Sequence, residues 1–216
     1  MLIEIRQLSP NIRLGLWRMD EPCEGTPRQR ERHAVQMLLT AMMGGDTTYG
    51  IGHEPSGKPF LTPSPAVPSP CLSISHTHGY AALLLSSDGS VGIDIERRSD
   101  RVERIASRFI RPDEQADTTD EKLLLWSAKE TVYKRYSEDQ LAFFDMRALP
   151  TATSSKPGVA ATEGMRGAIQ VENTKRGELV TVYYEFTTDY VLTYLIDPPR
   201  LRSASKPCKP GNLSQA

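Results

Sequence analysis

Two short segments hold residues whose types and spacing could bind a metal ion and a phosphate. Residues 91–96 read Val-Gly-Ile-Asp-Ile-Glu, an alternation of apolar and acidic residues that is typical of a β-strand. Because successive side chains of a strand point to opposite faces, Asp94 and Glu96 share one face, about 7 Å apart at Cα. Ile93 and Ile95 then bury the other face. Two carboxylates held this close repel each other unless a cation lies between them.

The second segment, Trp-Ser-Ala-Lys-Glu-Thr-Val-Tyr-Lys at 126–134, has a helical pattern. It places Glu130 and Lys134 one turn apart on one helix face. With Asp94 and Glu96, Glu130 would supply the third carboxylate of an oxygen-ligand site of the kind that Mg²⁺ prefers. A lysine beside such a site indicates phosphate chemistry.

Each feature also has a more ordinary interpretation when it is considered alone. Asp94 and Glu96 fit the solvated face of an edge strand, and Glu130 with Lys134 fits a surface ion pair contributing about 0.3–0.5 kcal/mol. Trp126 suggests core packing, and His76 suggests a structural histidine. A zinc site at His76 and His78 would lack a nearby cysteine or carboxylate to complete it. Only the joint occurrence of these motifs favours a catalytic site.

The elements that must position these residues can be read from periodicity and turn signals. Thr26-Pro27 predicts the start of a helix that runs to about Met43, where Gly44-Gly45 ends it, and 120–136 is the strongest helical segment of the chain. A weaker helical pattern covers 101–109, with a further helical turn at 111–114. The stretch 54–70, in which six of seventeen residues are proline, is predicted as an extended loop. Alternation predicts strands at 2–8, 12–17, 71–75, 81–86, 91–96, 164–171, 178–187 and 190–196.

These elements predict an α+β protein of two similar subdomains, each a small antiparallel sheet plus a long helix, related by a pseudo-twofold. The N-terminal subdomain would span 1–98 and the C-terminal one 99–197. The Asp88-Gly89 turn predicts that 91–96 pairs with the strand before it, in the first sheet. The segment 198–216 is polar, basic and proline-rich, and is expected to be a disordered tail.

Composition limits the classes of partner. The chain of 216 residues has a formal net charge of −1, which gives no bulk attraction to nucleic acid or to an anionic membrane. An anionic ligand would need a local basic cluster, such as Arg28, Arg30 and Arg32 at the start of the first helix. Three cysteines without a pairing pattern, and residues 1–6 without a signal-peptide plan, favour a soluble cytoplasmic protein.

On these motifs the sequence resembles the 4′-phosphopantetheinyl transferase superfamily, specifically the longer, surfactin-synthetase-activating type that activates non-ribosomal peptide and polyketide synthases. The resemblance rests on five motifs in order, over about residues 27 to 136, and on the general plan elsewhere. They are Gly57-Lys58-Pro59, Ile74-Ser75-His76, Gly92-Ile93-Asp94-Ile95-Glu96, the segment Phe109 to Glu114, and the segment Trp126 to Lys134.

The resemblance implies Mg²⁺-dependent transfer of the phosphopantetheine arm of coenzyme A to a serine of an acyl or peptidyl carrier protein, with release of adenosine 3′,5′-bisphosphate. It implies coenzyme A as co-substrate. The net charge favours no nucleic-acid or membrane partner, and a monomer is expected because two halves in one chain already build the cleft that holds the site. The rival interpretations are a Mg²⁺-dependent hydrolase of nucleotide pyrophosphates and a non-catalytic module that binds a carrier protein or a coenzyme.

The resemblance also implies roles for individual residues. Asp94, Glu96 and Glu130 would hold Mg²⁺, and Glu130 would also deprotonate the serine. Lys134 and Lys129 would stabilise the phosphates, while Glu114 would orient Lys134 or share in the metal or base chemistry. The expected coenzyme contacts are Ser75 and His76 to a phosphate, Lys58 near the adenine, and Arg28 and Arg32 to the ribose 3′-phosphate.

Overall fold

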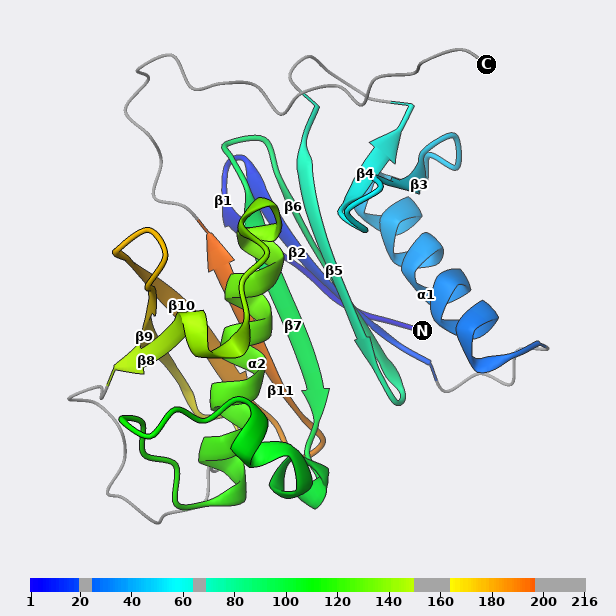
Figure 1. The fold of residues 1–216 in the computed structure, drawn as a ribbon. Helices are drawn as coiled ribbons and strands as arrows, with labels where there is room; N and C mark the ends of the chain where they lie inside the picture. Colours follow the sequence, from blue (N-terminus) through cyan, green and yellow to red (C-terminus); the bar gives the residue numbers. More distant parts are fainter. Residues whose placement is uncertain (20–24, 64–68, 150–163, 197–216) are drawn as a thin grey trace.

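A computed structural model describes residues 1–19, 25–63, 69–149 and 164–196. It has an α+β fold in which two antiparallel sheets each carry one long helix (Figure 1), so the predicted fold class is confirmed. The predicted tail at 198–216 lies outside the described residues. Of the helices within the described ranges, none combines the length and the apolar composition needed to cross a bilayer.

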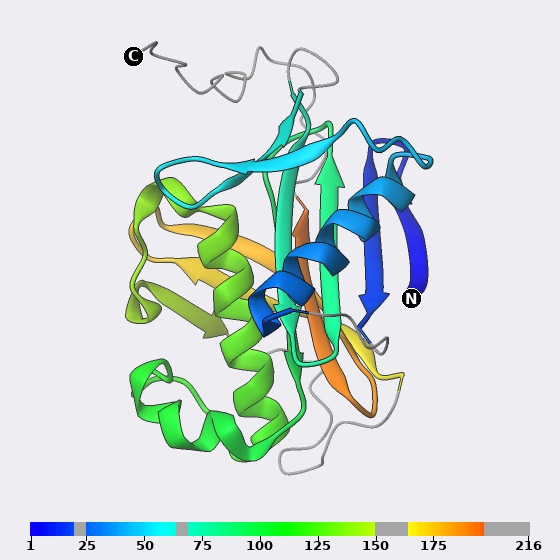
Figure 2. The same cartoon turned by 90° about the vertical axis from the view of Figure 1, so that its right-hand side faces the viewer.

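The N-terminal sheet has six strands in the order β1-β2-β6-β5-β4-β3. They are β1 (Leu2–Ser9), β2 (Ile12–Arg18), β3 (Gly50–His53), β4 (Pro59–Thr62), β5 (Cys71–Thr77) and β6 (Tyr80–Ser86). Helix α1 (Pro27–Met42) begins at a capping box formed by Thr26 and Gln29, as the sequence predicts. It lies across one face of this sheet (Figure 2), where Leu38 and Leu39 pack into a buried cluster with Leu83.

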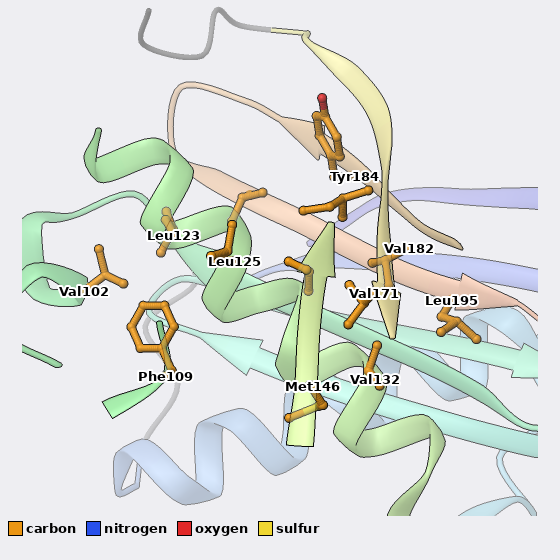
Figure 3. Close-up of a cluster of buried hydrophobic side chains, with 14 of the residues drawn as sticks. Val102, Phe109, Leu123, Leu125, Val132, Met146, Val171, Val182, Tyr184 and Leu195 are labelled. Carbon is orange, nitrogen blue, oxygen red and sulfur yellow. The ribbon is translucent and has the colours of Figure 1, made fainter. Parts of the chain in front are cut away.

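The C-terminal sheet has five strands in the order β7-β11-β10-β9-β8. They are β7 (Val91–Arg97), β8 (Met146–Leu149), β9 (Arg166–Asn173), β10 (Glu178–Phe186) and β11 (Tyr190–Ile196). Helix α2 (Thr119–Arg135) starts at a second capping box, made by Thr118 and Glu121. The 3₁₀ helices are η1 (Asp100–Arg108), η2 (Ser137–Asp139) and η3 (Phe143–Asp145). Figure 3 shows the core between α2 and this sheet, in which Leu125 and Val132 face Val171 and Val182.

The two halves follow the same path through their sheets. In the first half, β2 leads into α1 and the strand order is β2-β6-β5-β4-β3; in the second, β7 leads into α2 and the order is β7-β11-β10-β9-β8. Strand β1 is an addition at the edge of the first sheet. This repeat in topology is the relation that the predicted pseudo-twofold requires.

The prediction that residues 91–96 pair with the preceding strand is wrong. Strand β7 pairs with β11, with Asp94 opposite Thr193, and so belongs to the second sheet. The predicted boundary after residue 98 therefore falls one strand later than the division between the sheets. Alternation specifies which faces a strand buries but not which neighbour it pairs with.

Further differences concern short elements. The region expected to be an extended loop contains β4, which pairs with β3, and neither β3 nor β8 was predicted. Residues 101–109 form the 3₁₀ helix η1 and its end rather than an α-helix, and 111–114 is a turn. Four-residue strands offer too few positions to establish a period.

The two sheets meet through an apolar cluster and through side-chain hydrogen bonds. Ile93 and Ile95 of β7 pack with Leu14 and Leu16 of β2. Because β7 is an edge strand, some of its amides have no ladder partner. Side-chain hydroxyls of β5 accept hydrogen bonds from these amides instead. Ile93 N donates to Ser73 Oγ at 3.1 Å, and Arg97 N donates to Thr77 Oγ1 at 3.2 Å.

Gly92 allows α2 to approach β7 closely. A Cβ atom at this position would lie far inside van der Waals contact of the Thr131 carbonyl oxygen, and 3.3 Å from Cβ of Arg135. The obstructing oxygen belongs to the helix backbone and cannot rotate away. The glycine of the Gly-Ile-Asp motif is thus required by packing between the helix and the strand.

We therefore expect Gly92→Ala to lower the free energy of unfolding by about 2–3 kcal/mol, because the helix must move off the strand. Urea denaturation measures this loss. Gly50→Ala is the matched control in another strand, since its Cβ would meet nothing nearer than Thr62 atoms at 3.7 Å. Equal unfolding midpoints for the two variants would show that the close approach at Gly92 is unimportant.

Candidate active site

A cavity of about 530 Å³ lies between the two halves of the chain. Its walls come from the β3–β4 turn and β5 on one side, and from β7 and α2 on the other. The lining residues are His53, Ser56, Gly57, Lys58, Pro59, Leu72, Ser73, Ile74, Ser75, His76, Asp94, Glu96, Trp126, Glu130, Tyr133, Lys134 and Ser137.

The carboxylate of Asp94 is only 3% exposed and accepts hydrogen bonds from three sides. Ser75 Oγ and Lys134 Nζ donate to Oδ1 at 2.8 and 2.7 Å, and Ser127 Oγ donates to Oδ2 at 2.8 Å. The interpretation of Asp94 as a solvated surface residue is therefore wrong. The interpretation of Lys134 as one half of a surface ion pair with Glu130 is also insufficient, because its ammonium group contacts Asp94.

Glu96 lies one step further along the same strand face. Trp126 Nε1 donates to Glu96 Oε1 at 2.9 Å. Burial raises the pKa of Glu96 and the charge of Asp94 adds to the rise, against the lowering effects of the Trp126 hydrogen bond and Lys134. Trp126 also stacks on Phe143 with ring centroids 4.8 Å apart. It therefore packs in the core, as its residue type suggests, while its indole nitrogen fixes Glu96.

Glu130 differs from the other two carboxylates in receiving no hydrogen bond from the residues that the structure describes. Burial raises its pKa to about 7; Asp94 and Glu96 add to the rise, and Lys134 opposes it. Negative charge at this end of the cavity is therefore incompletely compensated. Glu130 is the carboxyl group that changes charge near neutral pH.

The donor set fits a hard divalent cation in its chemistry. Three carboxylates supply oxygen atoms only, and the raised pKa values of Glu96 and Glu130 reflect repulsion that a cation would relieve. Within the described ranges, no three His, Cys, Asp or Glu residues are already arranged around a common metal position. The ammonium of Lys134 provides the positive charge nearest Asp94 in this arrangement.

Helical spacing explains which residues of α2 reach the cavity. Trp126, Glu130, Tyr133 and Lys134 recur at three- and four-residue intervals and all line it. Lys129 stands three residues after Trp126 and four before Tyr133, so spacing alone does not keep it from the cavity. Its side chain is nevertheless fully buried in the core.

Lys129 and Glu114 are consequently not brought to the cavity, contrary to the role expected for them. Their side chains are 0% and 1% exposed and form a buried ion pair at 2.7 Å. Lys129 Nζ also donates to the Phe109 carbonyl at 2.6 Å, and Glu114 Oε1 accepts from Ala148 N at 2.6 Å. Burial lowers the pKa of Lys129, and Glu114 opposes that change. This position does not fit a contact with phosphate; the pair links α2 to the 109–114 segment and β8.

The residues expected to contact the coenzyme divide into two groups. Ser75, His76 and Lys58 line the cavity, whereas Arg28 and Arg32 are exposed on α1 and are not among its lining residues. Glu31 of the same helix lies 3.6 Å from His76 Nδ1. Helix α1 therefore presents a carboxylate, rather than a guanidinium, to this histidine.

Sequence reasoning missed several residues of the site. His53, Ser56 and Ser137 carried no motif signal, and Tyr133 could have been found from its three-residue spacing to Glu130. Ser127 stands inside the helix motif but received no role. Its hydrogen bond to Asp94 depends on how α2 crosses β7, which spacing within the helix does not determine.

Comparison with known families agrees with this geometry. The model of the 4′-phosphopantetheinyl transferase superfamily matches residues 90–195. The matched segment begins just before β7 and ends in β11, so it contains Asp94, Glu96, Glu130 and Lys134. No curated protein matches the chain.

Substitution of Glu130 should change how stability depends on pH. A carboxyl group whose pKa is higher in the folded state binds its proton more tightly there, so its contribution is complete below about pH 4.5 and is lost as pH rises through about 7. In metal-free buffer we expect the wild type to lose about 3 kcal/mol through this group over that range, and Glu130→Gln to lack the decline. Urea unfolding at a series of pH values measures it. With exposed Glu138→Gln as control, parallel curves for wild type and Glu130→Gln would contradict the raised pKa.

Substitution of Glu114 tests the buried ion pair. Glu114→Gln leaves Lys129 buried without a counter-charge, so we expect a loss of about 3 kcal/mol in the free energy of unfolding. Lys129→Met combined with Glu114→Gln should lose less, because no uncompensated charge remains. Chemical denaturation of the single and double variants measures this. A Glu114→Gln protein as stable as wild type would rule out the structural role.

Proposed function

We propose that this chain is a 4′-phosphopantetheinyl transferase that moves the phosphopantetheine arm of coenzyme A to a serine of an apo carrier protein. One observation carries the proposal: the segment that matches the superfamily folds so that Asp94, Glu96, Glu130 and Lys134 line one cavity. Acidic oxygen donors beside an ammonium group suit a substrate that carries a pyrophosphate.

Asp94, Glu96 and Glu130 would hold Mg²⁺. When bound there, the ion would neutralise the negative charge that develops on the pyrophosphate of coenzyme A. Two of the three carboxylates are held in place by the protein, Asp94 by Ser75 and Ser127 and Glu96 by Trp126. Such supporting hydrogen bonds orient ligands before the substrate arrives.

Glu130 would act as the general base. With its pKa near 7 and no donor from the described residues, its carboxylate can accept the proton of a serine hydroxyl at neutral pH. The serine oxygen forms a bond to the β-phosphorus of coenzyme A, and the bond from that phosphorus to the bridging oxygen breaks. Adenosine 3′,5′-bisphosphate leaves with the bond's electron pair.

Lys134 would stabilise the phosphates during this transfer. Its Nζ lies 2.7 Å from Asp94 and 3.1 Å from the Ile93 carbonyl, and its side chain is 24% exposed toward the cavity. The ammonium is thus held at the site and still accessible to a ligand. Lys129 would instead support the helix from the core.

Ser75, His76 and Lys58 would contact coenzyme A from the opposite wall of the cavity. Arg28 and Arg32 remain proposed contacts of the 3′-phosphate, at the N-terminal end of α1 where a helix attracts anions. The repeat of two halves in one chain supports the longer, surfactin-synthetase-activating type and a monomer, because both walls of the cavity come from a single chain.

Mass spectrometry of carrier proteins tests the proposal. An apo carrier incubated with the wild type, coenzyme A and Mg²⁺ should gain the mass of one phosphopantetheine arm. Asp94→Ala and Glu130→Ala should each lower the rate by at least about 100-fold, because each removes a metal ligand or the base. Chelation of Mg²⁺ should have the same effect.

Asp113→Ala serves as the control, since Asp113 is exposed and pairs only with surface arginines. Full activity of Asp94→Ala or Glu130→Ala would refute the assigned roles. Release of phosphopantetheine from coenzyme A without any carrier would instead indicate a pyrophosphate hydrolase. Binding of coenzyme A or of the carrier with no turnover of either would indicate a non-catalytic module.

A further inference from the structure

We infer that Thr193 of β11 is a positioning residue for Asp94, acting through the hydroxyl of Ser127. This inference rests on the proposed function, because it assigns Thr193 to the carboxylate proposed to hold Mg²⁺. Thr193 lies outside the motifs of the strand and helix segments, and it is 0% exposed.

Strand pairing places Thr193 beside Asp94. The two residues are direct partners in the antiparallel ladder of β7 and β11, so their side chains lie on the same face of the sheet. That face is covered by α2, whose Ser127 and Thr131 are also 0% exposed. Three hydroxyls and one carboxylate are therefore enclosed between the sheet and the helix.

These groups form a continuous chain of hydrogen bonds. Thr131 Oγ1 lies 2.7 Å from Thr193 Oγ1, which lies 2.8 Å from Ser127 Oγ, and Ser127 Oγ lies 2.8 Å from Asp94 Oδ2. Thr193 Oγ1 also donates to the backbone oxygen of Ser127 at 3.0 Å. Among the described residues, the hydrogen bonds between Thr193 and α2 are made at Ser127 and Thr131.

The direction of the chain follows from the charge of Asp94. An ionised carboxylate only accepts hydrogen bonds, so the proton of Ser127 points to Asp94. Ser127 Oγ can then only accept from Thr193, whose single proton is shared between this oxygen and the Ser127 carbonyl. Thr193 Oγ1 accepts in turn from Thr131. Hydrogen bonds aligned in one direction polarise each other, which strengthens the last donation to the carboxylate.

Without the Thr193 hydroxyl, the hydroxyl proton of Ser127 should be free to rotate away from Asp94. A serine within a helix can turn its proton to the carbonyl oxygen four residues earlier, and here the Thr193 contact opposes that alternative. With the proton turned away, Asp94 Oδ2 would lose its one donor among the described residues and would be free to change its orientation. The metal site would then be less well organised before binding.

The experiment compares Thr193→Val, which keeps the side-chain shape but removes the hydroxyl, with Thr193→Ser, which keeps the hydroxyl. Titration calorimetry with MgCl₂ is done on the full chain with saturating coenzyme A and no carrier protein. We expect Thr193→Val to weaken Mg²⁺ affinity about 10-fold or more, as is typical for residues that support a metal ligand. Thr193→Ser should stay within about 3-fold of wild type.

Thr181→Val is the control, because Thr181 lies in the same sheet and its hydroxyl, among the described residues, bonds to Gln170 and not to the site. If Thr193→Val does not fold, Thr131→Val replaces it, with a smaller expected loss of about 3-fold because its hydroxyl is one bond further from Asp94. Unchanged Mg²⁺ affinity in the valine variant would overturn the inference. Equal losses in the valine and serine variants would also overturn it, since packing rather than the hydroxyl would then matter.

The role of Thr193 and the proposed transferase function can fail independently, and the experiments distinguish the two failures. A wild type that loads the carrier while Thr193→Val binds Mg²⁺ normally refutes only the role of Thr193. A wild type that binds Mg²⁺ and shows the hydroxyl dependence, but never loads a carrier, refutes the transferase and leaves the positioning role in place. Absence of Mg²⁺ binding by the wild type refutes both the metal site and this inference.

Discussion

The close contact between α2 and β7 is the constraint on which the site depends. At Gly92 the strand has no side chain, and the backbone of α2 at Thr131 occupies that space. This contact sets the height of the helix above the strand, so that Ser127 and Lys134 reach Asp94 and Trp126 reaches Glu96. A wider separation would lengthen and weaken all three hydrogen bonds, which are now 2.7–2.9 Å long.

The same contact explains why negative charge is concentrated in one place. Asp94 is buried and stabilised by three donors, while Glu96 has one and Glu130 has none from the described residues. Carboxylates brought together in a partly buried cavity raise one another's pKa values, and this cost is offset when a cation binds. The difference in hydrogen bonding suits the carboxylates to different tasks. Asp94, with three donors, is held as a fixed ligand would be, and Glu130, with none from the described residues, is able to accept a proton.

Local patterns predicted much of this arrangement and left its long-range part undetermined. The first helix and its N-cap followed from Thr26-Pro27, the second helix from the periodicity of 120–136, and the shared face of Asp94 and Glu96 from alternation. Membership of β7 in the second sheet did not follow, because pairing with β11 joins residues about a hundred positions apart. Thr193 therefore carried no signal in the sequence.

The position of Lys129 illustrates a different kind of error. On the helix it lies between the buried residues Leu125 and Val132 and the cavity residues Trp126 and Tyr133. Periodicity therefore leaves its direction open. Its direction is set by Glu114 and the Phe109 carbonyl, which lie far from it in sequence. Arg28 and Arg32 stay proposed phosphate contacts, although Glu31 of the same helix is the residue that lies beside His76.

The most direct test of the central claim, that Asp94, Glu96 and Glu130 form one metal site, is anomalous X-ray scattering from crystals grown with MnCl₂ and coenzyme A. Mn²⁺ takes the same oxygen ligands as Mg²⁺ and is located by its own scattering. We predict one strong peak within coordination distance of all three carboxylates, in the cavity between the halves. A Mn²⁺ peak elsewhere would contradict the claim. So would the absence of any peak in a structure in which Lys134 still donates to Asp94.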